Sequence, residues 1–291
     1  MLRICLIGLG RTGKEIAKLI LAQEDMQLVM AVCGPNSEKA GKDLGDVLNI
    51  KANGIPVSEN QHLEHQLLRF QPDVAIDFSS PEATLENLPM LGKMKTPVVI
   101  GTTGFDEKQR WKLNSLVHHH KMGVAITPNV TFGVNVLMLL THLAAGILGD
   151  YDCTIVESHF SQKKDSPSGT AAMIAREIAS SRNYGEDQEP TPIHSLRAGG
   201  IIGSHKVVLA GEFDKIEIVH ESFSRTAFAQ GALKAARFIY GKSGLYEMSD
   251  ILNLKNALQA YMEKDPSSRW SKLAEDEFSH IPSESHNYNI L

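Results

Sequence analysis

The chain has 291 residues, a formal net charge of −5, 42% hydrophobic residues and 22% charged residues. This composition fits an ordinary globular protein without a basic excess, so it disfavours a global nucleic-acid-binding role. No apolar run is long enough to span a bilayer, and the apolar start of the chain leads into a glycine turn rather than a cleavage site. The three cysteines lack a CxxC spacing, so we expect buried thiols in a cytoplasmic protein.

The first half of the chain alternates short β-branched runs with amphipathic segments, which is typical of parallel βαβ architecture. The predicted strands are residues 3–8, 27–33, 73–78, 96–101 and 123–127. A long, mostly apolar helix is predicted at residues 133–148. This half therefore predicts a Rossmann-like dinucleotide-binding domain.

The pattern then changes to that of an α+β domain. Strands are predicted at residues 153–159, 193–199, 205–211 and 215–222, with one helix at 168–181 among them and a return to helical periodicity at 226–241. We expect an α/β protein in which residues 1–129 together with 224–254 form the dinucleotide-binding domain. An inserted α+β domain with a mixed sheet, residues 130–223, binds the substrate, and residues 255–291 form a polar C-terminal extension of unknown role.

A glycine turn follows the first predicted strand and opens the first helix. Its residues, all candidate cofactor contacts, are Gly8, Leu9, Gly10, Arg11, Thr12 and Gly13. Such a turn places backbone N–H groups and a helix N-terminus against a pyrophosphate. A tight turn that needs glycine only for packing is the alternative interpretation.

The second predicted strand ends without the usual ribose-binding acid. Residues 34–36 read Gly-Pro-Asn, and Ser37 and Lys39 follow nearby. Without a carboxylate to repel a 2′-phosphate, either NADPH or NADH can be the cofactor, with a slight preference for NADPH. A further turn after a later strand, formed by Gly101, Thr102 and Thr103, offers small residues and hydroxyls to the nicotinamide ribose or, alternatively, caps a helix.

Residues 157–172 combine a histidine, two lysines and a Pro-Ser-Gly-Thr turn before a helix. The helix N-terminus at Gly169 and Thr170, capped by Ser168 or Thr170, can hold a carboxylate or phosphate. His159 lies four residues before Lys163, and this pairing suits the protonation of a substrate whose negative charge is held nearby. A capped helix with solvated lysines is the structural alternative.

Together these motifs resemble the dihydrodipicolinate reductase family, also named 4-hydroxy-tetrahydrodipicolinate reductase. The resemblance covers about residues 2–254. It rests on segments in family order that include "IGLGRTGKEIA", "AIDFSSPEATLENL", "VVIGTTGF", "TPNVTFGVNVL", the His-x-x-x-Lys-x-Asp-x-Pro-Ser-Gly-Thr pattern and "SLRAGGIIGSHKVVLAG".

The resemblance implies hydride transfer from NADPH or NADH to a ring derived from 4-hydroxy-tetrahydrodipicolinate, a dicarboxylate. It implies that His159 donates or accepts a proton and that Lys163 is the second catalytic cation. The substrate carboxylates are implied to contact Ser168, Gly169 and Thr170. The implied cofactor contacts are Gly8 to Gly13, Gly101 to Thr103, Thr127, Pro128, Asn129 and Val130. A homotetramer formed through the second domain is also implied.

The chain departs from the family pattern at several positions. Phe160 stands where the family usually has a second histidine, the glycine turn is one residue shorter, and the ribose site lacks the family's acid and its basic neighbour. Two alternatives therefore stay open: a paralogue that reduces another cyclic imine dicarboxylate, and a non-catalytic dinucleotide-binding regulatory protein. No metal site is expected, because the adjacent histidines at 118–120 point in different directions on a helix.

Overall fold

The computed structural model describes residues 1–182 and 190–262. The chain divides into two units, residues 1–252 and 253–291, and helix α10 (Leu254–Met262) is the described part of the second. The polar pattern beyond residue 254 did not indicate this helix, and the rest of the predicted extension, residues 263–291, lies outside the described residues. None of the described helices combines the length and apolar character that a bilayer span requires.

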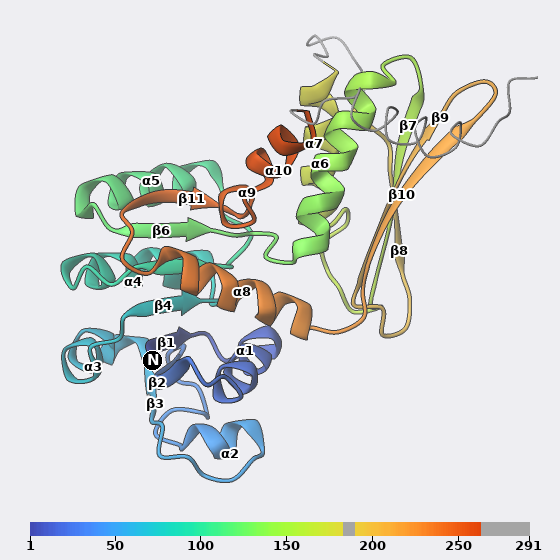
Figure 1. The fold of residues 1–291 in the computed structure, drawn as a ribbon. Helices are drawn as coiled ribbons and strands as arrows, with labels where there is room; N and C mark the ends of the chain where they lie inside the picture. Colours follow the sequence, from blue (N-terminus) through green and yellow to red (C-terminus); the bar gives the residue numbers. More distant parts are fainter. Residues whose placement is uncertain (183–189, 263–291) are drawn as a thin grey trace, which may run out of the picture. The chain divides into compact units, whose positions relative to one another are not determined.

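Seven parallel strands form the first sheet, in the order β11-β6-β5-β4-β1-β2-β3 (Figure 1). The strands are β1 (Leu2–Ile7), β2 (Met26–Cys33), β3 (Val57–Glu59), β4 (Val74–Asp77), β5 (Val98–Ile100), β6 (Gly123–Ile126) and β11 (Gly244–Glu247). From β1 the chain first adds β2 and β3 on one side of the sheet and then continues with β4 on the other side, so the direction of winding reverses at β1. In an open parallel sheet, ligands bind at the carboxyl ends of the strands near such a reversal.

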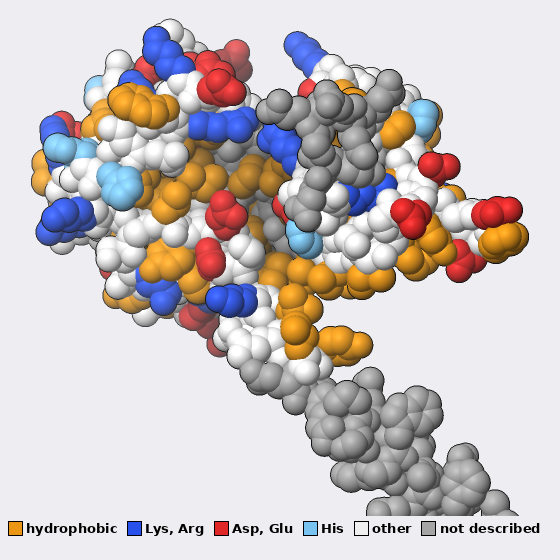
Figure 2. Space-filling view, turned by 90° about the horizontal axis from the view of Figure 1, so that it is seen from above, with side chains coloured by type: hydrophobic (Ala, Val, Ile, Leu, Met, Phe, Trp, Pro, Cys, Tyr) orange, Lys and Arg blue, Asp and Glu red, His pale blue; other side chains and the backbone are white. Residues whose placement is uncertain are grey.

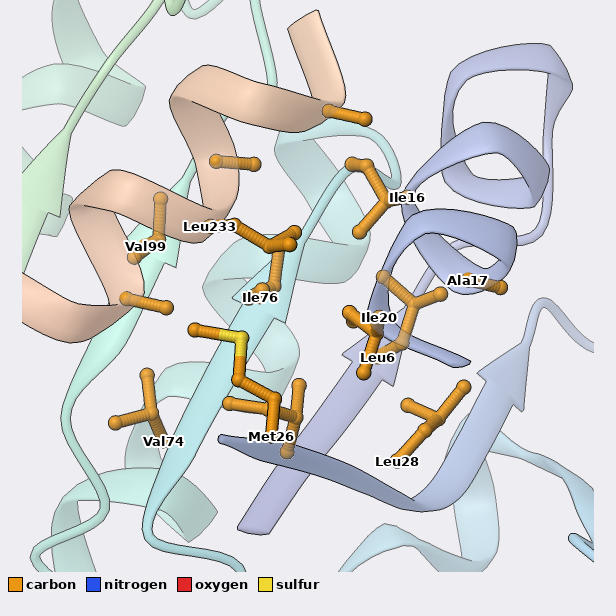
Figure 3. Close-up of a cluster of buried hydrophobic side chains, with 14 of the residues drawn as sticks. Leu6, Ile16, Ala17, Ile20, Met26, Leu28, Val74, Ile76, Val99 and Leu233 are labelled. Atoms are coloured by element: carbon orange, nitrogen blue, oxygen red, sulfur yellow. The ribbon is translucent and has the colours of Figure 1, made fainter. Parts of the chain in front are cut away.

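Helices cover both faces of this sheet. One hydrophobic core joins it to α1 (Arg11–Leu21), α2 (Leu44–Leu48), α8 (Thr226–Ile239) and α9 (Met248–Ile251), and another to α3 (Leu63–Phe70), α4 (Pro81–Lys93) and α5 (Glu107–His120). Figure 3 shows part of the first core, where Ile16 and Leu233 of two helices approach Ile76 of β4. Because both faces are buried, the strands are continuous apolar runs rather than alternating ones.

The second sheet is mixed and has the order β10-β9-β7-β8. Its strands are β7 (Asp152–His159), β8 (Ile193–Arg197), β9 (Gly203–Ala210) and β10 (Lys215–Ser222). Only β7 and β8 run parallel. Helices α6 (Phe132–Ile147) and α7 (Gly169–Ser181) bury one face of it in a third core.

The predicted fold class, a Rossmann-like sheet with a separate mixed sheet, is confirmed. Two strands of the first sheet, β3 and β11, are missing from the sequence prediction. Strands β4, β5 and β6 are equally short but read as apolar runs, whereas β3 reads Val-Ser-Glu and β11 reads Gly-Leu-Tyr-Glu, so neither of these two gives the apolar signal of a buried strand. They gain their place from pairing with β2 and β6, which are far more apolar.

Candidate active site

The glycine turn joins β1 to α1, and the structure gives a different physical reason for a glycine at each of its three positions. Gly8 has φ +94°, and a Cβ there would collide with the backbone of Phe78. A Cβ on Gly13 would collide with the carbonyl of Gly8, whereas one on Gly10 would meet no atom within 4 Å. Packing therefore requires Gly8 and Gly13, while Gly10 leaves open space at a helix start that no side chain caps. This cradle fits a pyrophosphate.

The remaining residues of the turn differ in exposure. Leu9 is buried in the core with only 3% of its surface exposed. Arg11 is exposed and Thr12 is half-buried, both at the start of α1. Arg11 and Thr12 can therefore offer side chains to a ligand, whereas Leu9 can offer only its backbone.

In the turn after β5, some residues are needed for packing and others are accessible to a ligand. A Cβ on Gly101 would enter the ring of Phe78. Thr102 is buried and accepts a hydrogen bond from Thr84 of α4 at 3.2 Å. Thr103 is exposed, so among these three predicted contacts it alone presents an unshielded side chain to a ligand.

Asp77, at the carboxyl end of β4, is a buried carboxyl that the sequence prediction does not include. It is 1% exposed, and its Oδ1 accepts hydrogen bonds from the backbone N–H of Ser79 at 2.9 Å and from the Ser79 hydroxyl at 2.5 Å. Burial raises the pKa of Asp77 from 3.8 to about 6, although these hydrogen bonds act in the opposite direction. Asp77 thereby fixes the turn that also carries Phe78.

Residues 127–130 follow β6 and connect the two sheets. Thr127 and Val130 are buried, and the Thr127 hydroxyl donates to the carbonyl of Ile100 at 3.2 Å. Pro128 is exposed. The Asn129 side chain accepts a hydrogen bond from Thr170 at 2.7 Å. A predicted cofactor contact and a predicted substrate contact therefore touch each other.

His159, the last residue of β7, lies in a network around the buried carboxylate of Glu157. Its Nδ1 contacts Glu157 Oε2, and Glu157 Oε1 accepts from Arg197 at 2.7 Å and from the backbone N–H of Ser168 at 3.3 Å. Burial alone would raise the pKa of Glu157, but the hydrogen bond from Arg197 and the neighbouring positive charge hold it well below its usual range. Burial lowers the pKa of His159, which Glu157 partly offsets.

The loop after β7 brings the chain back to the network around Glu157, where Ser168 donates its backbone N–H. Lys163 pairs with Asp165 at 2.8 Å, whereas Lys164 is exposed. Ser168 caps α7 by accepting from the N–H of Ala171 at 3.2 Å. Gly169 is exposed and Thr170 half-buried in the first turn of this helix, so the capped helix start that the sequence predicts is present, and anion binding there stays a prediction.

Besides Glu157, two further residues of this cluster are missing from the sequence prediction. His205 of β9 lies with its ring 5.2 Å from that of His159 and its Nε2 3.3 Å from the Ser168 hydroxyl. Arg197 of β8 reaches both Glu157 and the carbonyl of Asp165. Both come from strands more than 35 residues away in sequence. Only the alternation of β9, with His205 in line with the apolar Val207 and Leu209, gives a signal that this histidine points inward.

Phe160 stands between two guanidinium groups. Arg11 of the glycine turn lies 4.7 Å from its ring centre, and Arg225 before α8 lies 5.9 Å from it. These distances are those of cation–π contacts. The residue that departs from the family pattern therefore contacts the candidate cofactor turn directly.

Two surface hollows lie away from these residues. One is bordered by Tyr151, Arg182 and Pro192, and the other by Pro72, Lys121 and Tyr240 at the opposite edge of the first sheet. Neither contains a predicted site residue. We place the site by the convergent polar groups around His159 rather than by these hollows.

Comparisons with known proteins agree on one family. Residues 2–130 match the model "Dihydrodipicolinate reductase, N-terminus" and residues 133–252 match "Dihydrodipicolinate reductase, C-terminus". The 4-hydroxy-tetrahydrodipicolinate reductase of Methanocaldococcus jannaschii is 37% identical over 269 residues, covering 87% of this chain and 98% of that protein. The enzyme of the same name from Methanosarcina mazei is 38% identical over 256 residues, covering 84% and 96%.

A solved structure, dipicolinate-bound dihydrodipicolinate reductase from a Paenisporosarcina species, is similar with a TM-score of 0.69 and 28% identity, covering 85% of this chain and 97% of that one. An amine dehydrogenase from Mycobacterium smegmatis has a TM-score of 0.62 at 13% identity, covering 83% and 93%, and shares the fold alone. The fold, the glycine turn and these relatives together define an oxidoreductase that depends on a nicotinamide dinucleotide. More particularly, the chain belongs to the dihydrodipicolinate reductase family.

The raised pKa of Asp77 predicts how stability depends on pH. The folded state holds this proton more tightly than the unfolded state, so the contribution of Asp77 to stability is complete below pH 4 and is lost as the pH rises through 6. In Asp77→Asn this contribution does not titrate. We expect the free energy of unfolding of Asp77→Asn, relative to the native chain, to increase by up to about 3 kcal/mol between pH 4 and 7.

Urea denaturation at several pH values measures this difference. Asp46→Asn, which changes an exposed carboxylate on α2, is the control for the substitution itself. A difference between Asp77→Asn and the native chain that does not change with pH would contradict the assignment.

Proposed function

We propose that this chain reduces 4-hydroxy-tetrahydrodipicolinate to tetrahydrodipicolinate with NADPH or NADH, a step of lysine and diaminopimelate biosynthesis. The observation that carries the proposal is the match of nearly the whole chain to relatives of that name. In the overall reaction the ring loses one water and gains one hydride and one proton. A bound reduced nicotinamide supplies the hydride.

The proposed roles of the side chains follow from their surroundings. His159, at the edge of the buried network, exchanges a proton with the substrate. Lys163 supplies a positive charge where electron density collects after hydride arrival. The first turn of α7, with Ser168, Gly169 and Thr170, holds one substrate carboxylate through its N–H groups and the helix dipole.

The cofactor is proposed to lie along the carboxyl edge of the first sheet. The open cradle at Gly10 receives the pyrophosphate, and Arg11 and Thr12 face it. Thr103 and the backbone of residues 127–130 would line the nicotinamide end. The hydrogen bond between Asn129 and Thr170 supports this arrangement, because it joins the two candidate regions.

A second candidate is a paralogue that reduces another cyclic imine dicarboxylate. Phe160 favours it, because a phenyl ring cannot donate a hydrogen bond to a carboxylate as a histidine does. The cation–π contacts of Phe160 with Arg11 and Arg225 bring two other positive groups to that place. The identity of the substrate is therefore the point that an assay must decide.

We propose that both NADPH and NADH are used. The second strand lacks a ribose-binding acid, but Glu59 of β3 supplies a carboxylate beside the same turn. Its Oε1 accepts from the backbone N–H of Asn36 at 2.7 Å, and Gln61 holds Oε2 at 2.7 Å. A negative charge there opposes a 2′-phosphate and accepts from a 2′-hydroxyl. Glu59 thus offsets the slight preference for NADPH that the strand end and Lys39 suggest.

We propose a homotetramer built through the second sheet. One face packs on α6 and α7, and the other carries the side chains that alternate outward. These outward residues include Val156, Leu196, Val208 and Val219. Val219 is 57% exposed and Leu196 52%, and Figure 2 shows hydrophobic side chains at the surface of the right-hand part, where this sheet lies. The same face carries the ion pairs of Lys206 and Lys215 with Glu217, and the exposed apolar side chains around them favour burial against a second copy.

The domain division and the location are also proposals. Pairing of β11 with β6 supports a dinucleotide-binding domain of residues 1–129 with 224–254 around an inserted domain of residues 130–223. Limited proteolysis that cuts first near residues 130 and 223 would agree with this division. The three free thiols, Cys5, Cys33 and Cys153, support a cytoplasmic location, which cell fractionation would check.

Replacing Lys163 tests the proposed chemistry. We expect Lys163→Ala to lower kcat with 4-hydroxy-tetrahydrodipicolinate by about 10²-fold or more, because the charge opposite the developing negative charge is lost. The dissociation constants of NADPH and NADH should stay the same. A steady-state assay of cofactor oxidation measures kcat, and fluorescence titration measures the dissociation constants of the two cofactors.

The adjacent Lys164→Ala is the matched control, since Lys164 is exposed, and it should keep the native rate. Equal rates for the two variants would remove Lys163 from the mechanism. No oxidation of either cofactor by the native chain at millimolar substrate would instead defeat the proposed substrate and favour the paralogue.

The cofactor proposal predicts the effect of Glu59→Gln. Loss of a partly exposed charge is worth up to ~1 kcal/mol, so we expect the affinity for NADPH relative to NADH to rise by up to about fivefold. Fluorescence titration of the protein with each reduced cofactor gives the ratio. Glu64→Gln, an exposed glutamate of α3 that pairs with Lys93, is the control. A change of equal factor for both cofactors would contradict a role at the 2′ position.

The tetramer proposal predicts that Val219→Glu dissociates the assembly into smaller species, because a charge would be buried in the interface. Analytical ultracentrifugation measures the mass, and circular dichroism checks the fold. Leu68→Glu is the matched control, since Leu68 of α3 is also 57% exposed but lies on the first sheet's helical layer. A native chain that sediments as a monomer, or a Val219→Glu variant that stays tetrameric, would overturn this interface.

A further inference from the structure

The buried carboxylate of Glu157 is the feature from which a further role follows. We propose that Glu157 is a positioning residue that fixes the ring orientation and the proton position of His159, and that Arg197 keeps Glu157 ionised for this purpose. The inference rests on the proposed function, because it assigns to His159 the proton exchange with the substrate. It adds a residue pair to which no role has been assigned.

The contacts of Glu157 use both of its oxygens. Oε2 contacts His159 Nδ1, while Oε1 accepts from Arg197 and from the N–H of Ser168. The side chain of Glu157 is fully buried. A buried carboxylate without partners is strongly unfavourable, so these three donors hold its position. A rigid carboxylate is what the orientation of an imidazole requires.

The contact determines which ring nitrogen of His159 carries the proton. An ionised carboxylate can only accept hydrogen bonds, so Nδ1 must be the donor toward Glu157. In the neutral ring the other nitrogen, Nε2, is then the one that can take a proton. A Cβ built on Gly203 would lie 3.2 Å from this Nε2, so the absence of a side chain at Gly203 leaves room beside it.

The charges around His159 support the same assignment. Burial lowers the pKa of His159, and Lys163 and Arg197 act in the same direction, whereas Glu157 raises it. Glu157 is therefore the acidic group that restores protonation of a ring in positively charged surroundings. Because the pKa of Glu157 lies well below its usual range, the carboxylate stays ionised throughout the pH range in which the imidazole titrates.

His205, the other neighbour of the ring, does not take this role. Its Nε2 contacts the Ser168 hydroxyl, and burial lowers its pKa to about 3, with His159 as the second cause, so it stays neutral near pH 7. Glu157, His159 and His205 place one ligand atom each within 4.8 Å of one another, which would suit a cation. Arg197, 2.7 Å from Glu157, opposes a cation there, so we assign the cluster to positioning.

Glu157→Gln tests the proposal, because glutamine keeps the shape and removes the charge. We expect kcat to fall at least tenfold, and by no more than the ~10²–10⁴-fold that general acid–base catalysis contributes in full, with KM changed less than about threefold. The pKa of His159 should fall further, so the basic limb of the pH profile of kcat/KM moves to lower pH. Nitrogen NMR of labelled histidine should show loss of the Nδ1–H form.

Glu177→Gln is the matched control. Glu177 also lies beside a histidine, with 3.4 Å to His142, but both side chains are more than 40% exposed. It should keep the native rate and the native titration of His159, whose signal is identified by its absence in His159→Asn. A Glu157→Gln variant with the native titration and proton position of His159, whatever its rate, would overturn the proposal.

A second variant covers the case in which Glu157→Gln does not fold. Glu157→Asp keeps the charge but withdraws the carboxylate by one methylene, so we expect a smaller loss of kcat and a partial loss of the Nδ1–H form. Native values of both would overturn the proposal. The NMR titration needs no substrate, so it reads the positioning role even if the native chain fails to oxidise cofactor with the proposed substrate, a result that would defeat the proposed function alone.

Discussion

The pairing of one buried carboxylate constrains three elements around the second sheet. Glu157 is fully buried, so its charge must be matched within the protein, and Arg197, His159 and the N–H of Ser168 match it. Removal of one member of a buried ion pair typically costs about 3–5 kcal/mol. The cost applies at once to β7, β8 and the start of α7, because each supplies a partner. The same interaction that stabilises this region also arranges the groups proposed to take part in the reaction.

Arg197 extends this constraint to the loop that carries Lys163. Its guanidinium bonds to Glu157 and to the carbonyl of Asp165 at 2.6 Å. Because a guanidinium has several donors in a fixed plane, it can satisfy both acceptors together. The loop is thus held at its middle by Arg197 and at its end by the capping bond of Ser168. A lysine on such a loop has a defined place relative to His159 even though it is 22% exposed.

The sequence predicted the glycine turn, the strands of the second sheet and the helix start at Ser168, because these depend on local turn chemistry and periodicity. It did not predict Arg197, His205 or Glu59, because each reaches its neighbours through strand pairing across many residues. His159 was found by its spacing to Lys163, but its partner Glu157 lies two residues away on the same strand face. Sequence alone does not show that this strand face is buried. Without that knowledge, Glu157 cannot be distinguished from an ordinary surface glutamate of a strand.

Asp165 gives the loop a property of its own. Burial alone would raise the pKa of Asp165, but the pairing of its carboxylate with Lys163 and its interaction with the backbone of Gly169 hold that pKa below the ordinary value. The carboxylate of Asp165 thus occupies Lys163 and the start of α7, the groups that are proposed to bind the carboxylate of the substrate. An incoming dianion would exchange one acidic group for another instead of entering an uncompensated positive pocket. Affinity would then come from shape and multiple contacts more than from net attraction, and weak anions such as chloride or acetate would compete poorly.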